Sequence, residues 1–126
     1  ERIIAALGAH QERLSPEQHD RAVALASHLP LLAASALMLA VAQSSDAPDA
    51  FAFAAGGFRD TTRVASGSPR MARDICLTNT APLLDALDTY LTALQALREQ
   101  IAAHDTTIEE AFTAARDARN GWLLGD

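Results

Sequence analysis

The sequence contains no lysine, one cysteine and few aromatic residues. The absence of lysine reflects genome composition more than chemistry, whereas the other two scarcities bear on the compartment and the fold. Cys76 has no partner within the chain, so an internal disulfide is excluded and a reducing compartment, the cytoplasm, is expected. Aromatic residues make up 5% of the chain, whereas apolar residues, mainly alanine and leucine, make up 49%. Because β-branched residues are also sparse, this composition favours helices over strands. We therefore expect an all-α protein.

The excess of acidic residues limits the partners that the chain can bind. Its 16 acidic and 10 basic residues give a net charge of −6, which argues against nucleic acid and anionic membranes. No Gly-x-Gly-x-x-Gly, P-loop or paired-cysteine spacing occurs, so we predict no cofactor-binding residue in this chain. His19 and His28 lie nine residues apart, on opposite faces of one α-helix, so no metal site is predicted either.

A long central helix is the main feature of the N-terminal half. Ser15, Pro16 and Gln18 are typical of a helix start, with an N-cap, a proline at the first position and a capping-box glutamine. The helix extends to about Gln43, and Pro30 predicts a kink in its middle.

This helix is apolar on all sides between residues 22 and 42, apart from Ser27, His28 and Ser35. Its length would suit a membrane span, but its alanine content, His28, Pro30 and the unanchored flanks argue against one. The other interpretation is a central helix that a second subunit covers on one side.

The remaining signals predict about six helices in one domain, residues 1–126. Thr80 is expected to cap a helix that carries a leucine stripe to His104, Thr106 and Glu109 to form a capping box, and Asn120-Gly121 to end the last helix. The first segment begins inside an amphipathic helix without a cap, so we expect the natural chain to begin upstream. The predicted helices cover residues 1–7, 16–43, 59–66, 69–79, 80–104 and 106–120.

The segment from Gly56 to Cys76 carries the candidate chemistry. Two glycines lead into a helical run in which Arg59 and Arg63 lie four residues apart, on one face, beside Asp60. This pattern indicates an anion-binding site. On spacing alone, an exposed ion pair between Asp60 and Arg63 explains the same residues. His28, close to the proline kink, is either a ligand-facing histidine or a core histidine bonded to a backbone carbonyl.

Three sequence blocks carry a resemblance to a known family. They are Ser15-Pro16-Glu17-Gln18-His19-Asp20, then Ser27-His28-Leu29-Pro30, and then Gly56-Gly57-Phe58-Arg59-Asp60-Thr61-Thr62-Arg63-Val64-Ala65 followed by Arg73-Asp74-Ile75. In order and spacing they resemble the C-terminal helical domain of prephenate dehydrogenases. The resemblance covers nearly the whole chain.

The resemblance implies a helical dimerisation and substrate-closing domain like those of 6-phosphogluconate-dehydrogenase-like enzymes, in an intertwined homodimer. It implies NAD-dependent oxidative decarboxylation of prephenate to 4-hydroxyphenylpyruvate, in tyrosine biosynthesis. An N-terminal Rossmann domain outside this chain would bind NAD and supply the catalytic histidine, so no catalytic residue is expected here. Arg63 matches an arginine that grips a substrate carboxylate. Asp60 and Gly56 match cleft positions, and His28 matches a histidine near the substrate entrance.

The sequence departs from the family pattern at two positions. Many relatives have a second histidine where this chain has Leu31, which puts in doubt any role that needs two histidines. Many have a tryptophan where this chain has Ala72, which indicates altered packing. An arogenate dehydrogenase domain and a non-catalytic helical dimerisation module remain alternatives. The choice between NAD and NADP and feedback by tyrosine stay open.

Overall fold

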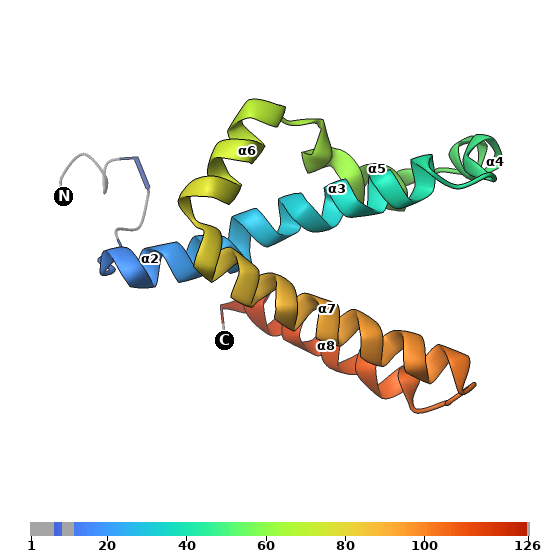
Figure 1. Cartoon of the computed structure of the whole chain (residues 1–126). Helices are drawn as coiled ribbons and strands as arrows, with labels where there is room; N and C mark the ends of the chain where they lie inside the picture. The colour runs from blue at the N-terminus through green and yellow to red at the C-terminus, as the bar shows by residue number, and fades with distance from the viewer. Residues whose placement is uncertain (1–6, 9–11, 126) are drawn as a thin grey trace. The chain divides into compact units, whose positions relative to one another are not determined.

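The computed structural model describes residues 7–8 and 12–125, and every regular element in these residues is helical (Figure 1). The predicted all-α class is therefore confirmed. The chain divides into two compact units, Glu1–Ala86 and Leu87–Asp126. The described elements are α2 (Pro16–Val23), the π-helix η1 (Ala24–His28), α3 (Leu29–Ala42), α4 (Ala47–Ala52), α5 (Gly56–Thr62), the 3-10 helix η2 (Arg63–Ser66), α6 (Pro69–Thr78), α7 (Thr80–Ala102) and α8 (Ile108–Leu124).

The long N-terminal helix begins as predicted. The backbone N–H of Gln18 donates to Ser15 Oγ at 3.2 Å, and the Gln18 side chain accepts from the Ser15 N–H at 2.9 Å, which completes a capping box. The disturbance expected at Pro30 takes the form of η1. There, the Leu29 N–H bonds the carbonyl of Ala24, five residues back. A proline lacks an N–H and crowds the preceding turn, and the wider π turn relieves that crowding.

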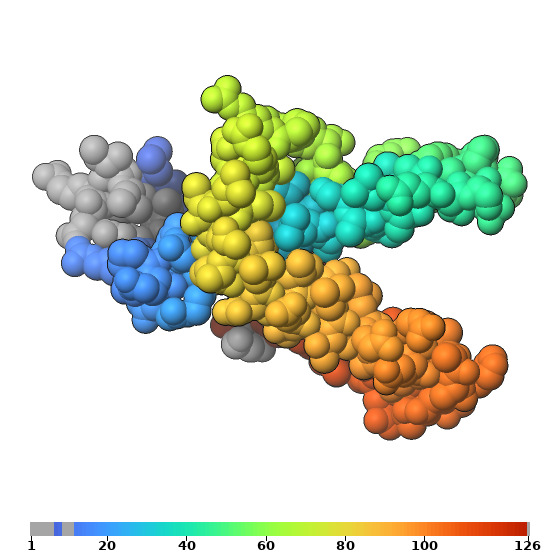
Figure 2. All heavy atoms as spheres, in the orientation of Figure 1, coloured from blue at the N-terminus to red at the C-terminus, as the bar shows by residue number. Residues whose placement is uncertain are grey.

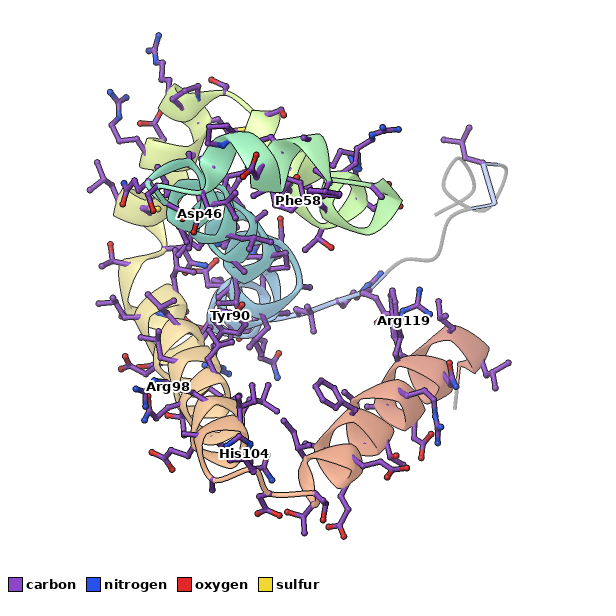
Figure 3. The ribbon with its side chains drawn as sticks, turned by 90° about the vertical axis from the view of Figure 1, so that its right-hand side faces the viewer. Asp46, Phe58, Tyr90, Arg98, His104 and Arg119 are labelled. Carbon is purple, nitrogen blue, oxygen red and sulfur yellow. The ribbon has the colours of Figure 1, made fainter. Side chains whose placement is uncertain are left out.

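The first unit is organised around α3, which contacts α4, α5 and η2. Figure 2 shows α4 and α5 (green) against α3 (cyan). Ala34 is 3% exposed at the centre of α3, so a small side chain brings the helices close together there. Phe51 of α4 and Phe58 of α5 form an edge-on ring contact with centroids 6.2 Å apart; Phe58 is labelled in Figure 3. The packing holds α5 and η2 along one side of α3.

Helix α4 was not predicted, since the predicted helices leave residues 44–58 without one. Pro48 instead occupies the first turn of this short helix, where its missing N–H costs nothing. The predicted helix over residues 59–66 also begins too late. Gly56 and Gly57 are its first two residues, and its last turn is the 3-10 segment η2. The predicted helix over residues 1–7 lies, except for Leu7, outside the described residues.

The predicted start of α6 is confirmed, since Ser68 Oγ accepts from the Met71 N–H with Pro69 next to the cap. Thr80 was expected to cap the start of α7, and the structure shows another role for it. Its hydroxyl donates to the carbonyls of Cys76 (2.7 Å) and Leu77 (3.2 Å). Thr80 therefore satisfies the C-terminal end of α6.

Both predicted ends of the last helix are wrong. The N-cap of α8 is Thr107, not the predicted Thr106, and its side chain accepts no capping hydrogen bond. The backbone N–H of Thr107 instead donates to Asp105 Oδ1 at 2.9 Å. At the other end, α8 continues through Gly121 to Leu124. It stops at Gly125, whose φ of 77° is left-handed. Trp122, in the last turn of α8, is 74% exposed.

The second unit leaves much apolar surface uncovered. Figure 3 shows α7 and α8 diverging from the turn at His104. The side chains of Leu91 and Ile101 on α7 are 51% and 63% exposed, and Phe112 on α8 is 59% exposed. In the first unit, the segment Pro16–Ala42 is long and apolar enough to cross a membrane, judged by length and composition. Large apolar surfaces of this kind are typical of interaction sites.

Candidate functional site

A hollow of about 620 Å³ lies where α3 meets α5 and η2. Residues of α3 form one wall, and residues of α5 and η2 form the other. Its lining is mixed, with two arginines, small hydroxyl side chains and apolar groups. The lining residues are Ser35, Met38, Leu39, Arg59, Thr62, Arg63, Ala65 and Ser66.

The hollow is positively charged. Arg59 and Arg63 both line it, one helical turn apart, and no lining residue is acidic. Both arginines are exposed. Among the described residues neither guanidinium takes part in an ion pair or hydrogen bond, including the ion pair between Asp60 and Arg63 that the spacing allowed. The two guanidinium groups are therefore available for an anion, and the planar fork of arginine suits a carboxylate.

The hydroxyl groups of the hollow are used within the helices. Ser35 Oγ donates to the Leu31 carbonyl at 2.8 Å, and Thr62 Oγ1 donates to the Phe58 carbonyl at 2.7 Å. Thr62 is only 8% exposed. Because these hydroxyls have partners within their own helices, the strongest free donors in the lining are the two arginines.

Of the four predicted site residues, Arg63 lines the hollow. Gly56 and Asp60 lie four residues apart on α5 and therefore share one face of that helix, next to the face that carries Arg59. A Cβ atom added at Gly56 would meet no atom within 4 Å among the described residues. Packing inside the chain thus does not require a glycine there. Asp60 is exposed.

His28 is part-buried at the end of η1 and does not line the hollow. It lies seven residues before Ser35, so the two fall on the same face of the helix, about 10 Å apart along its axis. Its Nδ1 atom is 3.2 Å from Nδ2 of Asn79. The core interpretation of His28 assumed a backbone carbonyl partner, and the partner found at Nδ1 is a side-chain amide.

Sequence reasoning missed several residues around the site. The sequence analysis noted Ser35 only as a polar exception on an apolar helix. Its spacing from His28 was a usable signal for a shared face. Thr62 lies next to Arg63, but its burial follows from packing against α3 and has no local signal. Asn79 lies 51 residues from His28, so no periodicity connects them.

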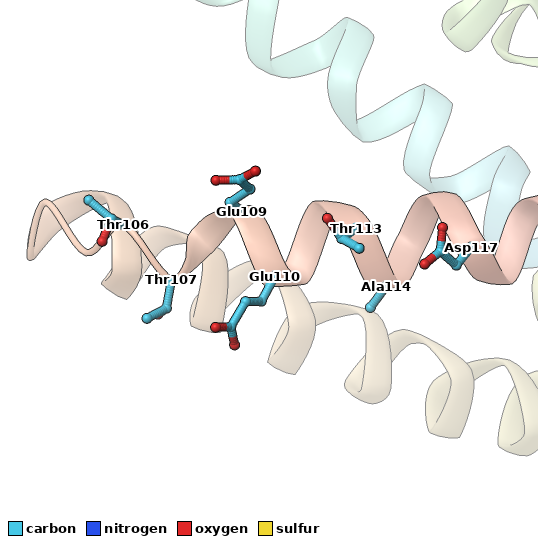
Figure 4. Close-up of a pocket in the computed structure, with 7 residues that line it drawn as sticks. All are labelled: Thr106, Thr107, Glu109, Glu110, Thr113, Ala114 and Asp117. Carbon is cyan, nitrogen blue, oxygen red and sulfur yellow. The ribbon is translucent and has the colours of Figure 1, made fainter.

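A second hollow, of about 550 Å³, lies in the other unit at the start of α8 (Figure 4). Its lining includes Glu109, Glu110 and Asp117, and these carboxylates would repel an anion. The described residues contain no group of three or more His, Cys, Asp or Glu side chains that could hold a metal ion. The arginine-lined hollow is therefore the candidate anion site.

Comparison with known proteins gives a consistent result. Residues 15–114 match the family model for the prephenate dehydrogenase dimerization domain. The chain is 36% identical to a prephenate dehydrogenase of Bacillus subtilis (strain 168) over 124 residues, 97% of this chain and 33% of that protein. The chain thus spans about a third of the length of this relative.

Solved structures show the same fold. An arogenate dehydrogenase of Synechocystis superposes with a TM-score of 0.88 and 30% identity over 96% of this chain and 45% of that one. A prephenate dehydrogenase of A. aeolicus, in complex with hydroxyphenyl propionate and NAD+, superposes with a TM-score of 0.78 and 32% identity. That match covers 99% of this chain and 43% of the other.

Proposed function

Since the chain belongs to the prephenate dehydrogenase dimerization domain family, we propose that it is the dimerisation and substrate-closing part of an NAD-dependent prephenate dehydrogenase. The enzyme would convert prephenate to 4-hydroxyphenylpyruvate by oxidative decarboxylation, in tyrosine biosynthesis in the cytoplasm. NAD would act as hydride acceptor. This sequence has no dinucleotide fingerprint, so we assign NAD binding and the catalytic histidine to an N-terminal Rossmann domain joined to it.

The observation that carries the proposal is the hollow lined by two arginines, neither of which has an ion-pair or hydrogen-bond partner among the described residues. Prephenate is a dianion, and Arg63 would grip one of its carboxylates through a bidentate contact. Arg59 adds positive charge to the same hollow. We further propose that Asp60 and Gly56 border the substrate from the neighbouring face of α5, and that His28 contacts the substrate at its entrance. The role of these residues is to bind and orient the substrate.

Arogenate is the second candidate substrate, because the Synechocystis structure with the same fold is an arogenate dehydrogenase. Arogenate carries an ammonium group where prephenate has a keto group. The lining of the hollow offers two guanidinium groups and no carboxylate, and Asp60, the carboxylate of the proposed site, lies on α5 outside that lining. The charge of the lining favours prephenate, whereas an Asp60 that reached the substrate's amino group would favour arogenate. The ratio of kcat/KM values for the two substrates tests the choice, and a ratio that favours arogenate would reverse it.

The uncovered apolar surface supports a homodimer. Leu25 and Leu39 on the central helix are 57% and 58% exposed, and apolar side chains of α7 and α8, among them Leu91, Ile101 and Phe112, are exposed as well. A second copy of the chain would cover these surfaces and give an intertwined dimer. A bilayer around Pro16–Ala42 is the competing explanation. The family name supports the dimer.

One experiment tests both parts of the proposal. Purified in detergent-free buffer at micromolar concentration, the chain alone should sediment as a dimer and should not oxidise prephenate. The same chain joined to its nucleotide-binding domain should reduce NAD when prephenate is added. A monodisperse monomer would refute the dimer. A dimer without turnover in the joined protein would favour the non-catalytic module.

A further inference from the structure

Asn79 is a buried side chain that contacts α2 and η1, which lie more than 50 residues before it in the sequence. It is 7% exposed and lies between α6 and α7. Its Nδ2 atom is 2.8 Å from the backbone carbonyl oxygen of Asp20, in α2, and 3.2 Å from Nδ1 of His28, in η1. Within the described residues, no buried side-chain nitrogen or oxygen lacks a hydrogen-bond partner. The amide nitrogen of Asn79 is therefore bonded to two groups of the central helix.

The contact to Asp20 fixes the orientation of the amide. A backbone carbonyl oxygen only accepts, so the amide atom that faces it must be the NH₂ group. Turning the amide over would bring two oxygens together. The NH₂ group has two hydrogens, one for the Asp20 carbonyl and one for His28. The Nδ1 atom of His28 must then present its lone pair, and in the neutral ring the proton lies on Nε2.

His19 provides a contrast on the same helix. Its Nδ1 atom is 3.2 Å from Oδ1 of Asp20, and a carboxylate oxygen accepts. The Nδ1 atom of His19 therefore donates. The two histidines, nine residues apart, are thus expected to carry their protons on different ring nitrogens.

We propose that Asn79 is a positioning residue that fixes the orientation of the His28 ring and holds its proton on Nε2. The Nε2–H group is then a donor that suits an oxygen of the substrate. The other tautomer would offer a lone pair to that oxygen and would repel it. This part of the inference rests on the role proposed above for His28 in substrate binding, whereas the tautomer itself does not.

The tautomer can be measured directly. In the chain labelled with ¹⁵N-histidine, long-range ¹H–¹⁵N spectra distinguish a protonated ring nitrogen from a bare one. We expect a protonated Nε2 for His28 in the wild type, a mixture of tautomers in Asn79→Ala, and the proton on Nδ1 in Asn79→Asp, whose carboxylate can only accept. Asn120→Ala, a change at an exposed asparagine, should leave the His28 signals unchanged. A proton on Nδ1 of His28 in the wild type would overturn the proposal, even if both Asn79 variants fail to fold.

A double-mutant cycle in the intact enzyme tests the functional consequence. Asn79→Ala should lower kcat/KM about threefold to tenfold per folded molecule, the range of one neutral hydrogen bond. In a His28→Ala background the same change should have less than about a twofold effect, because Asn79 acts through His28. Additive effects of the two changes would overturn the positioning role. An unchanged kcat/KM in His28→Ala alone would overturn the proposed role of His28 and leave the tautomer to the spectra.

Discussion

Replacing Arg63 by alanine tests the candidate site most directly. Arg63 lines the hollow between α3, α5 and η2 and has no ion-pair or hydrogen-bond partner among the described residues. Its loss should therefore change the free energy of unfolding by less than about 0.5 kcal/mol, as for an ordinary surface substitution. A large effect on activity could not then be attributed to unfolding.

The expected kinetic effect follows from the environment of the ion pair. An exposed ion pair contributes less than about 1 kcal/mol, whereas losing one partner of a desolvated pair costs about 2 to 4 kcal/mol. We expect the second case, because the substrate and the rest of the enzyme would cover the arginine. At 1.36 kcal/mol per tenfold change, kcat/KM falls roughly 30- to 900-fold in Arg63→Ala. Most of the loss should appear in KM. Arg63→Lys should recover part of it, because lysine restores the charge without the planar fork.

Steady-state kinetics of the intact enzyme with prephenate would measure these effects, with NAD saturating. Arg70→Ala is the matched control. Arg70 is an exposed arginine of α6 outside the hollow, and its loss changes the net charge by the same amount, from −6 to −7. The kcat/KM of Arg70→Ala for prephenate should stay within about twofold of the wild-type value. The NAD affinity should be unchanged in both variants. If Arg63→Ala also leaves KM within about twofold, Arg63 is a surface residue and the site assignment is wrong.

Two further predictions concern the ends of α8. Gly121→Ala should raise the free energy of unfolding by about 0.5–1 kcal/mol, because Gly121 lies inside the helix. Gly125→Ala should lower the free energy of unfolding by about 1 kcal/mol, because φ at this residue is 77°. Chemical denaturation measures both changes, and equal changes in the two variants would contradict the observed helix end. The hydrogen bonds from Thr107 lower the pKa of Asp105, so their stabilisation is present above its ordinary value of about 3.9 and is lost as the pH falls through the lowered pKa. The melting temperature of Asp105→Asn should therefore lie below that of the wild type at neutral pH and approach it below about pH 3, and a constant difference across this range would exclude the carboxylate as the cap.

Local chemistry made the helix starts at Ser15 and Ser68 predictable. In both cases a serine hydroxyl precedes a proline and accepts from a backbone N–H three residues later, so the whole signal lies within four residues. The end of α8 was not predictable in this way. Asn120-Gly121 and Gly125 are competing stop signals, and helix propensity alone does not decide which one takes the left-handed conformation.

The candidate site was predictable only in part, for a related reason. Arg59 and Arg63 share a face through helical spacing, which sequence reasoning detects. The other wall of the hollow comes from α3, and the hydrogen bond between Asn79 and His28 spans 51 residues. Such contacts depend on how the helices pack, and the π turn before Pro30 also changes the face that each residue of the central helix presents. The argument that His19 and His28 lie on opposite faces assumed an unbroken α-helix.

In the proposed enzyme, the wall of the hollow on α3 would connect substrate binding to dimerisation. Leu39 lines the hollow and is nevertheless 58% exposed, and Leu37, two residues earlier, is 37% exposed. Whatever covers this helix therefore comes to lie beside the arginine-lined hollow. Removing water from the neighbourhood of Arg63 lowers the local dielectric and strengthens its interaction with a carboxylate. In the isolated chain, where Arg63 is exposed, prephenate should bind weakly. The loss of about 2 to 4 kcal/mol expected for Arg63→Ala therefore requires the assembled enzyme that we propose, in which a second copy and the nucleotide-binding domain would close the hollow.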